Sequence, residues 1–221
     1  MTSDILQPAF ITFTGVDEVD LIPGMQAISA KYPVEWGVLM DVAQEGTPLF
    51  PVAQVRQAFQ KTALRLSAHV CGTAARAIVE GRDVELDLGG FARLQVNHGR
   101  AGSTESEIQH SYLFGVRQGV RPALQCQGDF PADARVDWLY DVSFGEGVRP
   151  KTWPNVDGTS PFCGFSGGLN PANVGAMLSK LCIASGAVFW IDMESGVRTN
   201  NRFDLAKCEA ICEIVYGKRT A

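Results

Sequence analysis

The chain has 221 residues, of which 46% are hydrophobic and 19% are charged, and its formal net charge is −5. A chain of this length buries enough apolar surface for one sizeable domain. The mild acidic balance argues against a large basic face for nucleic acid, although a single local site still binds a small anion. No run of about 18 apolar residues is present, so we expect no membrane span.

The N-terminus and the cysteines indicate a reducing environment. The first ten residues include Asp4 and lack a cationic segment, so we expect no signal peptide and a cytoplasmic location. Thiols stay reduced in the cytoplasm, and the six cysteines form no Cys-x-x-Cys pair. Most of them are therefore expected to be small buried hydrophobic residues.

Eight short apolar runs alternate with helix-like stretches along the chain. Near-continuous apolar runs are typical of parallel strands that are covered on both faces. The expected strands are residues 10–14, 36–41, 64–70, 92–96, 123–127, 136–141, 162–165 and 188–192. The expected helices are residues 21–32, 51–61, 73–80, 105–118, 170–185 and 204–216.

This alternation predicts a parallel α/β fold. The length suits a (β/α)₈ TIM barrel, which needs roughly 200–250 residues, and we expect one such barrel domain over residues 1–221. Two connections are atypical, because residues 128–135 are too few for a crossover helix and residues 143–160 are rich in Gly and Pro. An open doubly wound sheet is the alternative. The first strand–helix junction lacks Gly-x-Gly-x-x-Gly, so a dinucleotide cofactor is disfavoured and no cofactor is expected.

The clearest functional signal lies near the C-terminus. Gly167 and Gly168 follow the seventh expected strand, and Ser195 and Gly196 follow the eighth. Adjacent glycines let the backbone approach a ligand closely. In (β/α)₈ enzymes a phosphate often lies between these two loops, beside a helix N-terminus. Either of the two residue pairs alone is compatible with a tight turn. Together they predict a site for the phosphate group of a small metabolite, next to a helix that starts near Pro171.

The same residues resemble a known family. Gly-Gly-Leu-Asn-Pro-Ala-Asn-Val at 167–174 and Ile-Asp-Met-Glu-Ser-Gly-Val at 191–197 resemble two motifs of phosphoribosylanthranilate isomerases of tryptophan biosynthesis, Gly-Gly-Leu-x-Pro-x-Asn-Val and Asp-x-x-Ser-Gly-Val. Leu139-Tyr140-Asp141, followed by Gly145-x-Gly147, resembles that family's sixth strand end and its glycine-rich loop. The resemblance implies a (β/α)₈ isomerase in which Asp141 is the general acid.

The first half of the chain departs from this pattern. Thr14, in Thr-Phe-Thr-Gly, stands where the family's Lys-Ile-Cys-Gly carries its catalytic base. Threonine does not act as a base near neutral pH without an activating partner. The family's Ser-Pro-Arg after strand two is replaced near Thr47 by Gly-Thr-Pro, without the arginine that would hold the anthranilate carboxylate. The phosphate half of the site is therefore retained, and the half that recognises and deprotonates the substrate is altered.

An Amadori-type isomerisation needs an acid to open the sugar ring and a base to move a proton from C2. Asp141 is the candidate acid, and His69, near the end of the third strand, is a candidate for the missing base. Asp41 and Asp192 end the second and eighth strands and are expected to contact the substrate. Two alternatives stay open: an altered relative that only binds a phosphorylated metabolite, and a phosphosugar epimerase-like enzyme with Asp41, His69 and Asp141 around a divalent ion such as Zn²⁺.

Overall fold

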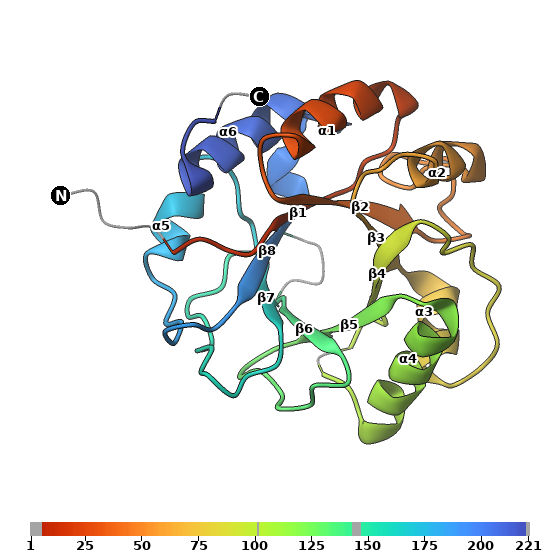
Figure 1. The fold of residues 1–221 in the computed structure, drawn as a ribbon. Helices are drawn as coiled ribbons and strands as arrows, with labels where there is room; N and C mark the ends of the chain where they lie inside the picture. The colour runs from red at the N-terminus through yellow and green to blue at the C-terminus, as the bar shows by residue number, and fades with distance from the viewer. Residues whose placement is uncertain (1–5, 101, 143–146, 220–221) are drawn as a thin grey trace.

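Eight parallel strands close into a barrel in the computed structural model, which describes residues 6–100, 102–142 and 147–219. Closure pairs the first strand with the last, with Ile11 beside Ile191 (Figure 1). The predicted (β/α)₈ barrel is confirmed, and the open doubly wound alternative is wrong. The strands are β1 (Ile11–Thr14), β2 (Val34–Met40), β3 (Leu66–Val70), β4 (Phe91–Val96), β5 (Arg121–Cys126), β6 (Asp137–Tyr140), β7 (Cys163–Phe165) and β8 (Phe189–Met193).

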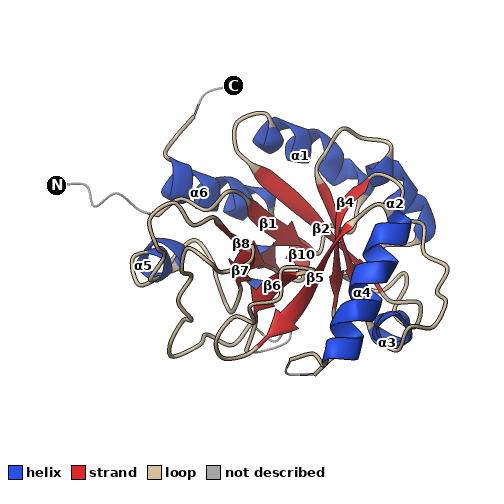
Figure 2. Cartoon of the chain, turned by 60° about the horizontal axis from the view of Figure 1, so that its bottom comes forward, coloured by secondary structure: helices blue, strands red, loops and turns tan. Residues whose placement is uncertain are grey.

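Helices cover the barrel unevenly. Each of the first four strands is followed by one helix, whereas the connections β5–β6 and β6–β7 contain none in their described residues. Figures 1 and 2 show loops covering that sector of the wall. The α-helices are α1 (Ile22–Ser29), α2 (Ala53–Gln60), α3 (Gly72–Val79), α4 (Glu105–Gln118), α5 (Val174–Leu178) and α6 (Leu205–Tyr216).

The two long helices begin where side-chain oxygens cap them. Thr104 and Glu107 form a reciprocal capping box at the start of α4, which ends at Gly119 with φ 69°. The carboxylate of Asp204 accepts the backbone N–H groups of Ala206 and Lys207 at the start of α6. These caps explain why α4 has the predicted bounds and why α6 begins one residue later than predicted, directly after its cap Asp204.

The helix expected over residues 170–185 is wrong, because α5 has only five residues, Val174–Leu178. At its N-terminal side, Asn173 accepts from the N–H of Asn170, and Asn170 accepts from the N–H of Ala172. Such side-chain bonds hold the backbone in turns that compete with a helix. At its C-terminal side, Ile183 pairs with Val156 in a parallel bridge.

The main hydrophobic core lies between the barrel and the helices. Strand side chains alternate between the two faces of the wall, and large apolar residues such as Trp36, Trp138 and Phe165 are fully buried in this outer layer. A separate small cluster of Phe10, Leu139 and Trp190 forms a second core. Four of the six cysteines are buried, as expected, and all six are free thiols.

The barrel interior carries a buried ionic layer near the N-terminal ends of the strands. Arg93 on β4 contacts Glu35 on β2 at 3.1 Å and Asp137 on β6 at 3.5 Å. Neither strand is a neighbour of β4 in the sheet, so these ion pairs cross the barrel interior. The Arg93 guanidinium also lies 4.1 Å from the ring centroid of Trp190. This layer closes one end of the barrel and leaves the other end for a cavity.

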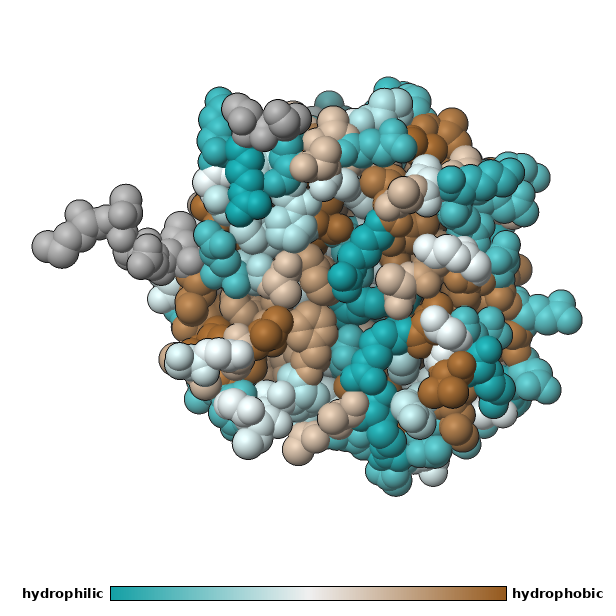
Figure 3. All heavy atoms as spheres, in the orientation of Figure 1, coloured by the Kyte–Doolittle hydropathy of each residue, from teal (hydrophilic) through white to brown (hydrophobic). Residues whose placement is uncertain are grey.

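The outer surface is mixed in character. Figure 3 shows hydrophilic and hydrophobic residues interspersed over the visible face. None of the helices in the described ranges is both long enough and apolar enough to cross a membrane.

Candidate active site

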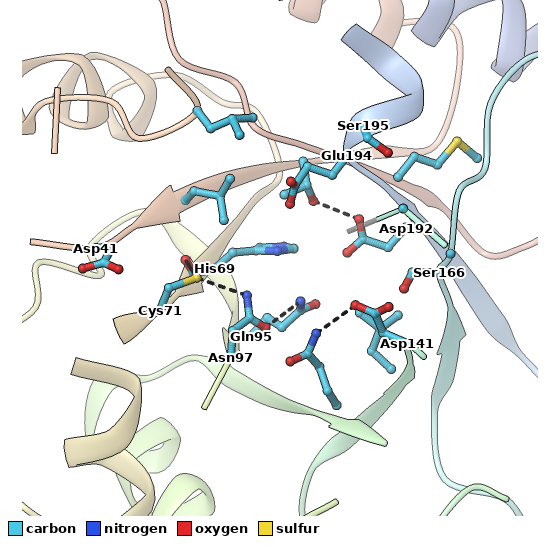
Figure 4. Close-up of a pocket in the computed structure, with 18 of the residues that line it drawn as sticks. Asp41, His69, Cys71, Gln95, Asn97, Asp141, Ser166, Asp192, Glu194 and Ser195 are labelled. Atoms are coloured by element: carbon cyan, nitrogen blue, oxygen red, sulfur yellow. Dashed lines mark hydrogen bonds between the residues drawn. The ribbon is translucent and has the colours of Figure 1, made fainter. Parts of the chain in front are cut away.

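A cavity of about 700 Å³ lies at the C-terminal ends of the strands. (β/α)₈ enzymes place their active sites at this end of the barrel. The cavity brings together nearly all of the residues singled out in the sequence: Thr14, Asp41, His69, Asp141, Gly167, Gly168, Asp192 and Ser195. Figure 4 shows side chains from opposite sides of the barrel facing this space.

Thr14 and Asp192 form a buried pair in the cavity floor. The Thr14 hydroxyl donates to Oδ1 of Asp192 at 2.9 Å. Burial raises the pKa of Asp192 to about 8, repulsion from Glu194 and Asp141 adds to the shift, and the Thr14 hydrogen bond opposes it. Because the hydroxyl of Thr14 acts as a donor, Thr14 is arranged to position Asp192 rather than to serve as a base.

Glu194 is a further carboxylate of the cavity wall that the family motif does not single out. Burial raises the pKa of Glu194 to about 7, repulsion from Asp141 adds to the shift, and Arg198 opposes it. A group with a pKa near neutral is suited to accept a proton and return it. The sequence does carry a sign of this residue, because Glu194 is a carboxylate at the second variable position of the Asp-x-x-Ser-Gly-Val motif.

Asp141 follows β6 and is buried at the cavity wall. Its backbone N–H extends the β5–β6 ladder by donating to the carbonyl of Cys126 at 3.1 Å. Nε2 of Gln125 donates to Oδ2 of Asp141 at 3.0 Å. In Figure 4 the carboxylates of Asp141 and Asp192 both face the middle of the cavity. The structure thus gathers Asp141, Asp192 and Glu194 into one electrostatically coupled group.

His69 faces the cavity from β3 but is poorly suited to be the base. It is only 2% exposed, and burial, with repulsion from Arg93, lowers its pKa to about 3. Its imidazole is therefore neutral at physiological pH and a weak proton acceptor. Burial likewise raises the pKa of the nearby Cys71 thiol to about 11, so thiolate is scarce.

Gly37 on β2 provides the space in which Thr14 and His69 lie. A Cβ atom at this position would lie 2.4 Å from Oγ1 of Thr14 and 3.0 Å from Nε2 of His69. Real Cβ atoms do not approach other atoms as closely as the first of these distances. The absence of a side chain at Gly37 is therefore needed for the floor of the cavity.

Asp41 lies at the rim, where it caps its own loop. Its carboxylate accepts from the N–H of Ala43 at 3.0 Å and from Nε2 of Gln44 at 3.2 Å. Figure 4 shows Asp41 well apart from Asp141. Within the described ranges, no three His, Cys, Asp or Glu residues form a group that could hold a metal ion. Asp41, His69 and Asp141 therefore form no such group in the described part of the chain.

Three loops meet in close backbone contact beside the carboxylates. A Cβ atom on Gly168 would lie 2.4 Å from the carbonyl oxygen of Gly147, and one on Gly147 would lie 2.5 Å from Oγ of Ser195. A Cβ atom on Gly196 would lie 1.8 Å from the carbonyl oxygen of Leu169. The loops after β6, β7 and β8 therefore need glycine here. Gly145, the other glycine of the first loop, lies outside the described residues.

The glycine pair after β7 presents unused donors. Gly167 and Gly168 have φ values of 126° and 59°, a backbone form that favours glycine. Nδ2 of Asn173 fixes the turn by donating to the carbonyl of Gly168 at 2.8 Å. The N–H groups of Gly167 and Gly168 donate to none of the described residues. Because α5 starts only at Val174, any anion here would be bound by these loops and not by a long helix.

The fold and the cavity define a (β/α)₈ barrel with a polar site at its C-terminal end. No protein-family model matches the chain, and no curated protein matches it.

Solved structures with a similar fold include two phosphoribosylanthranilate isomerases. The enzyme from Thermus thermophilus aligns with a TM-score of 0.61 at 10% identity, over 92% of this chain and 96% of that one. The enzyme from Pyrococcus furiosus aligns with a TM-score of 0.58 at 13% identity, over 93% and 98%. KGPDC from Streptococcus mutans aligns with a TM-score of 0.51 at 12% identity, over 95% and 98%. At these identities the likeness shows the fold alone, which is a (β/α)₈ barrel.

Proposed function

We propose that this protein is an isomerase of a phosphorylated sugar derivative, of the aldose–ketose type. The observation that carries the proposal is that unused backbone donors and a coupled group of carboxylates open into one cavity. The backbone donors are suited to bind a phosphate group, and the carboxylates are suited to transfer protons at the other end of the same ligand.

The phosphate would bind at the loops after β7 and β8. Its oxygens would accept from the N–H groups of Gly167 and Gly168, with the Ser195 hydroxyl and the backbone of Gly196 completing the site. Oriented backbone donors bind anions without a cationic side chain. The conformation of these loops is set by the close glycine contacts and by Asn173, so the donors are in place before a ligand arrives.

The acid would come from Asp141 and Asp192. Burial, with repulsion from Glu194 and Asp141, raises the pKa of Asp192 to about 8, so Asp192 retains a proton near neutral pH. Asp141, held by Gln125, would relay this proton from Asp192 to the ring oxygen as the C1–O bond breaks. The electron pair on the C1 nitrogen would then form a C1–N double bond.

The base would be Glu194. Its carboxylate would remove the C2 proton, the C–H electrons would form a C1–C2 double bond, and the electron pair of the C1–N double bond would return to nitrogen, giving an amino-enol. Return of that proton to C1, with transfer of the enol O–H proton back to Asp141, gives the C2 ketone. Every atom is accounted for, and no oxidant, reductant or co-substrate is needed. Thr14 and His69 are thereby positioning residues and not the base.

Proton movement at C2 tests this proposal directly. Ribose 5-phosphate mixed with ammonia or with anthranilate forms the two glycosylamines in situ, and ketose formation with C2–H exchange in D₂O is followed by NMR. We expect protein-dependent exchange with at least one amine. A general acid or base typically contributes about 10²–10⁴-fold, so Asp141→Asn and Glu194→Gln should each reduce the rate by that order.

A binding control separates catalysis from ligand recognition. We expect Gly168→Asp to abolish binding of inorganic phosphate in calorimetry, because the new side chain would clash with Gly147 and repel the anion. Phosphate binding without exchange for either amine would contradict the isomerase proposal and favour a protein that only binds a phosphorylated metabolite. Unchanged phosphate affinity in the Gly168→Asp variant would contradict the proposed phosphate site.

A further inference from the structure

The wall of the cavity directs its amide donors inward, toward the protein. Nε2 of Gln95 donates to Oδ1 of Asn97 at 3.0 Å, and Nδ2 of Asn97 donates to Sγ of Cys71 at 3.4 Å. Nε2 of Gln125 donates to Asp141. The carbonyl oxygens of Gln95 and Gln125 accept no hydrogen bond from the described residues, although both side chains line the cavity. The wall therefore offers carbonyl acceptors to a ligand, beside the second N–H group that each of these amides retains.

The charged groups on this wall have a single sign. Asp41, Asp141, Asp192 and Glu194 line the cavity, and no arginine or lysine is among the described residues that line it. Burial, together with repulsion among the last three, raises the pKa values of Asp192 and Glu194. A ligand carboxylate placed here would add to that repulsion, whereas a ligand cation would relieve it.

Arg198, the cation nearest to Glu194 in sequence, is held outside this space. Its Nη1 donates to the carbonyl of Gly15 at 2.8 Å, and its Nη2 forms an ion pair with Asp17 at 2.7 Å. Both contacts tie the loop after β8 to the loop after β1. The guanidinium is therefore already occupied and is not offered to a substrate carboxylate.

His69 supplies an independent indication of a polar ligand. The residue is only 2% exposed, its ring lines the cavity, and the ring forms no hydrogen bond within the described part of the chain. A polar ring that opens into a cavity gains from a hydrogen-bond partner placed there. Figure 4 shows the ring directed into the space between Asp192 and Gln95. A ligand donor in that space would satisfy it.

We infer that the ligand portion beyond the phosphate is an amine-bearing, hydroxyl-rich sugar chain without a carboxylate. This inference rests on the proposed function and names its substrate class. In the open-chain aminoketose, the ammonium group would lie against Glu194 and Asp192, and the hydroxyl groups would donate to Gln95, Gln125 and His69. The ligand would then carry a negative and a positive end, matched to the glycine loops and to the carboxylates.

Three phosphorylated pentitols that differ only at C1 test this inference by calorimetry. They are 1-amino-1-deoxyribitol 5-phosphate, ribitol 5-phosphate, and the N-(2-carboxyphenyl) derivative of the amine. We expect the amine to bind at least about tenfold more tightly than ribitol 5-phosphate, which is the scale of one hydrogen bond between charged groups. We expect the carboxyphenyl compound to bind more weakly than the amine. Binding of the amine should also release protons to the buffer, because it favours ionised carboxylates.

A pair of matched variants locates the effect. Glu194→Gln should reduce the preference for the amine toward unity, while Glu80→Gln, which changes an exposed carboxylate outside the cavity, should retain it. Equal affinity for the amine and for ribitol 5-phosphate, or tightest binding of the carboxyphenyl compound, overturns the inference and leaves the phosphate site standing. Failure of all three compounds and of inorganic phosphate to bind overturns the proposed function together with it.

Discussion

Replacing Asp192 by asparagine should change how the stability of the protein depends on pH. The folded-state pKa of Asp192 is raised to about 8, whereas an unfolded aspartate titrates near about 3.9. Between these values the folded state binds more protons than the unfolded state, so the free energy of unfolding falls as pH rises. Asparagine carries no titrating proton, yet its side-chain oxygen still accepts from Thr14.

The magnitude follows from the number of protons involved. One proton held by the folded state lowers stability by about 1.4 kcal/mol per pH unit inside the window. Asp192 alone should therefore destabilise the protein by about 3 kcal/mol between about pH 5 and pH 7. The free energy of unfolding of Asp192→Asn should therefore fall by about 3 kcal/mol less than that of the wild type between about pH 5 and pH 7. Glu194, with its pKa raised to about 7, still contributes in the variant, so the pH dependence is reduced and not abolished.

Urea unfolding followed by tryptophan fluorescence measures this effect, since Trp36, Trp138 and Trp190 are fully buried. The comparison needs wild type, Asp192→Asn and the surface control Asp20→Asn at several pH values. We expect only Asp192→Asn to flatten the curve. The same loss of stability with pH in wild type and Asp192→Asn would refute the reasoning that Asp192 is buried with its proton.

Three other substitutions test the packing and the floor of the site. Arg93→Ala leaves the buried carboxylates of Glu35 and Asp137 without their shared partner. It should lower the free energy of unfolding in urea by about 3–5 kcal/mol. A smaller loss would mean that water solvates these carboxylates in the variant. Gly164→Ala places a Cβ atom 2.2 Å from Trp190 and should cost about 1–3 kcal/mol by the same assay. Thr14→Val removes the hydrogen bond that lowers the pKa of Asp192. An NMR titration of the carboxyl groups should therefore show a higher pKa for Asp192 in the variant. A lower pKa would contradict the role of Thr14 as a donor to Asp192.

The barrel was predictable because its determinants are local. Apolar runs with two buried faces, separated by stretches long enough for helices, leave few arrangements other than a closed parallel sheet. Capping residues such as Thr104 and Asp204 also fixed two helix starts. The helix after β7 was not predictable in the same way, because the pairing of Ile183 with Val156 joins segments far apart in the chain.

The candidate site was predictable only in part. Glycines and strand-end carboxylates mark the open end of the barrel through their order in the sequence, and this places Asp141, Asp192 and Gly168 in one cavity. The pKa values of Glu194 and His69 depend on burial and on charges from other strands, which no local pattern encodes. The hydrogen bond from Thr14 to Asp192 likewise depends on the pairing of β1 with β8, which joins the two ends of the chain.

The phosphate site is the claim on which the proposed function depends most directly. A ¹H–¹⁵N correlation spectrum of the protein, recorded during titration with inorganic phosphate, reports on each backbone N–H group. We expect saturable downfield shifts of the Gly167 and Gly168 amides, accompanied by those of Ser195 and Gly196, as the N–H groups donate to phosphate. Unchanged signals for these four residues, or saturable shifts confined to another part of the molecule, would contradict it.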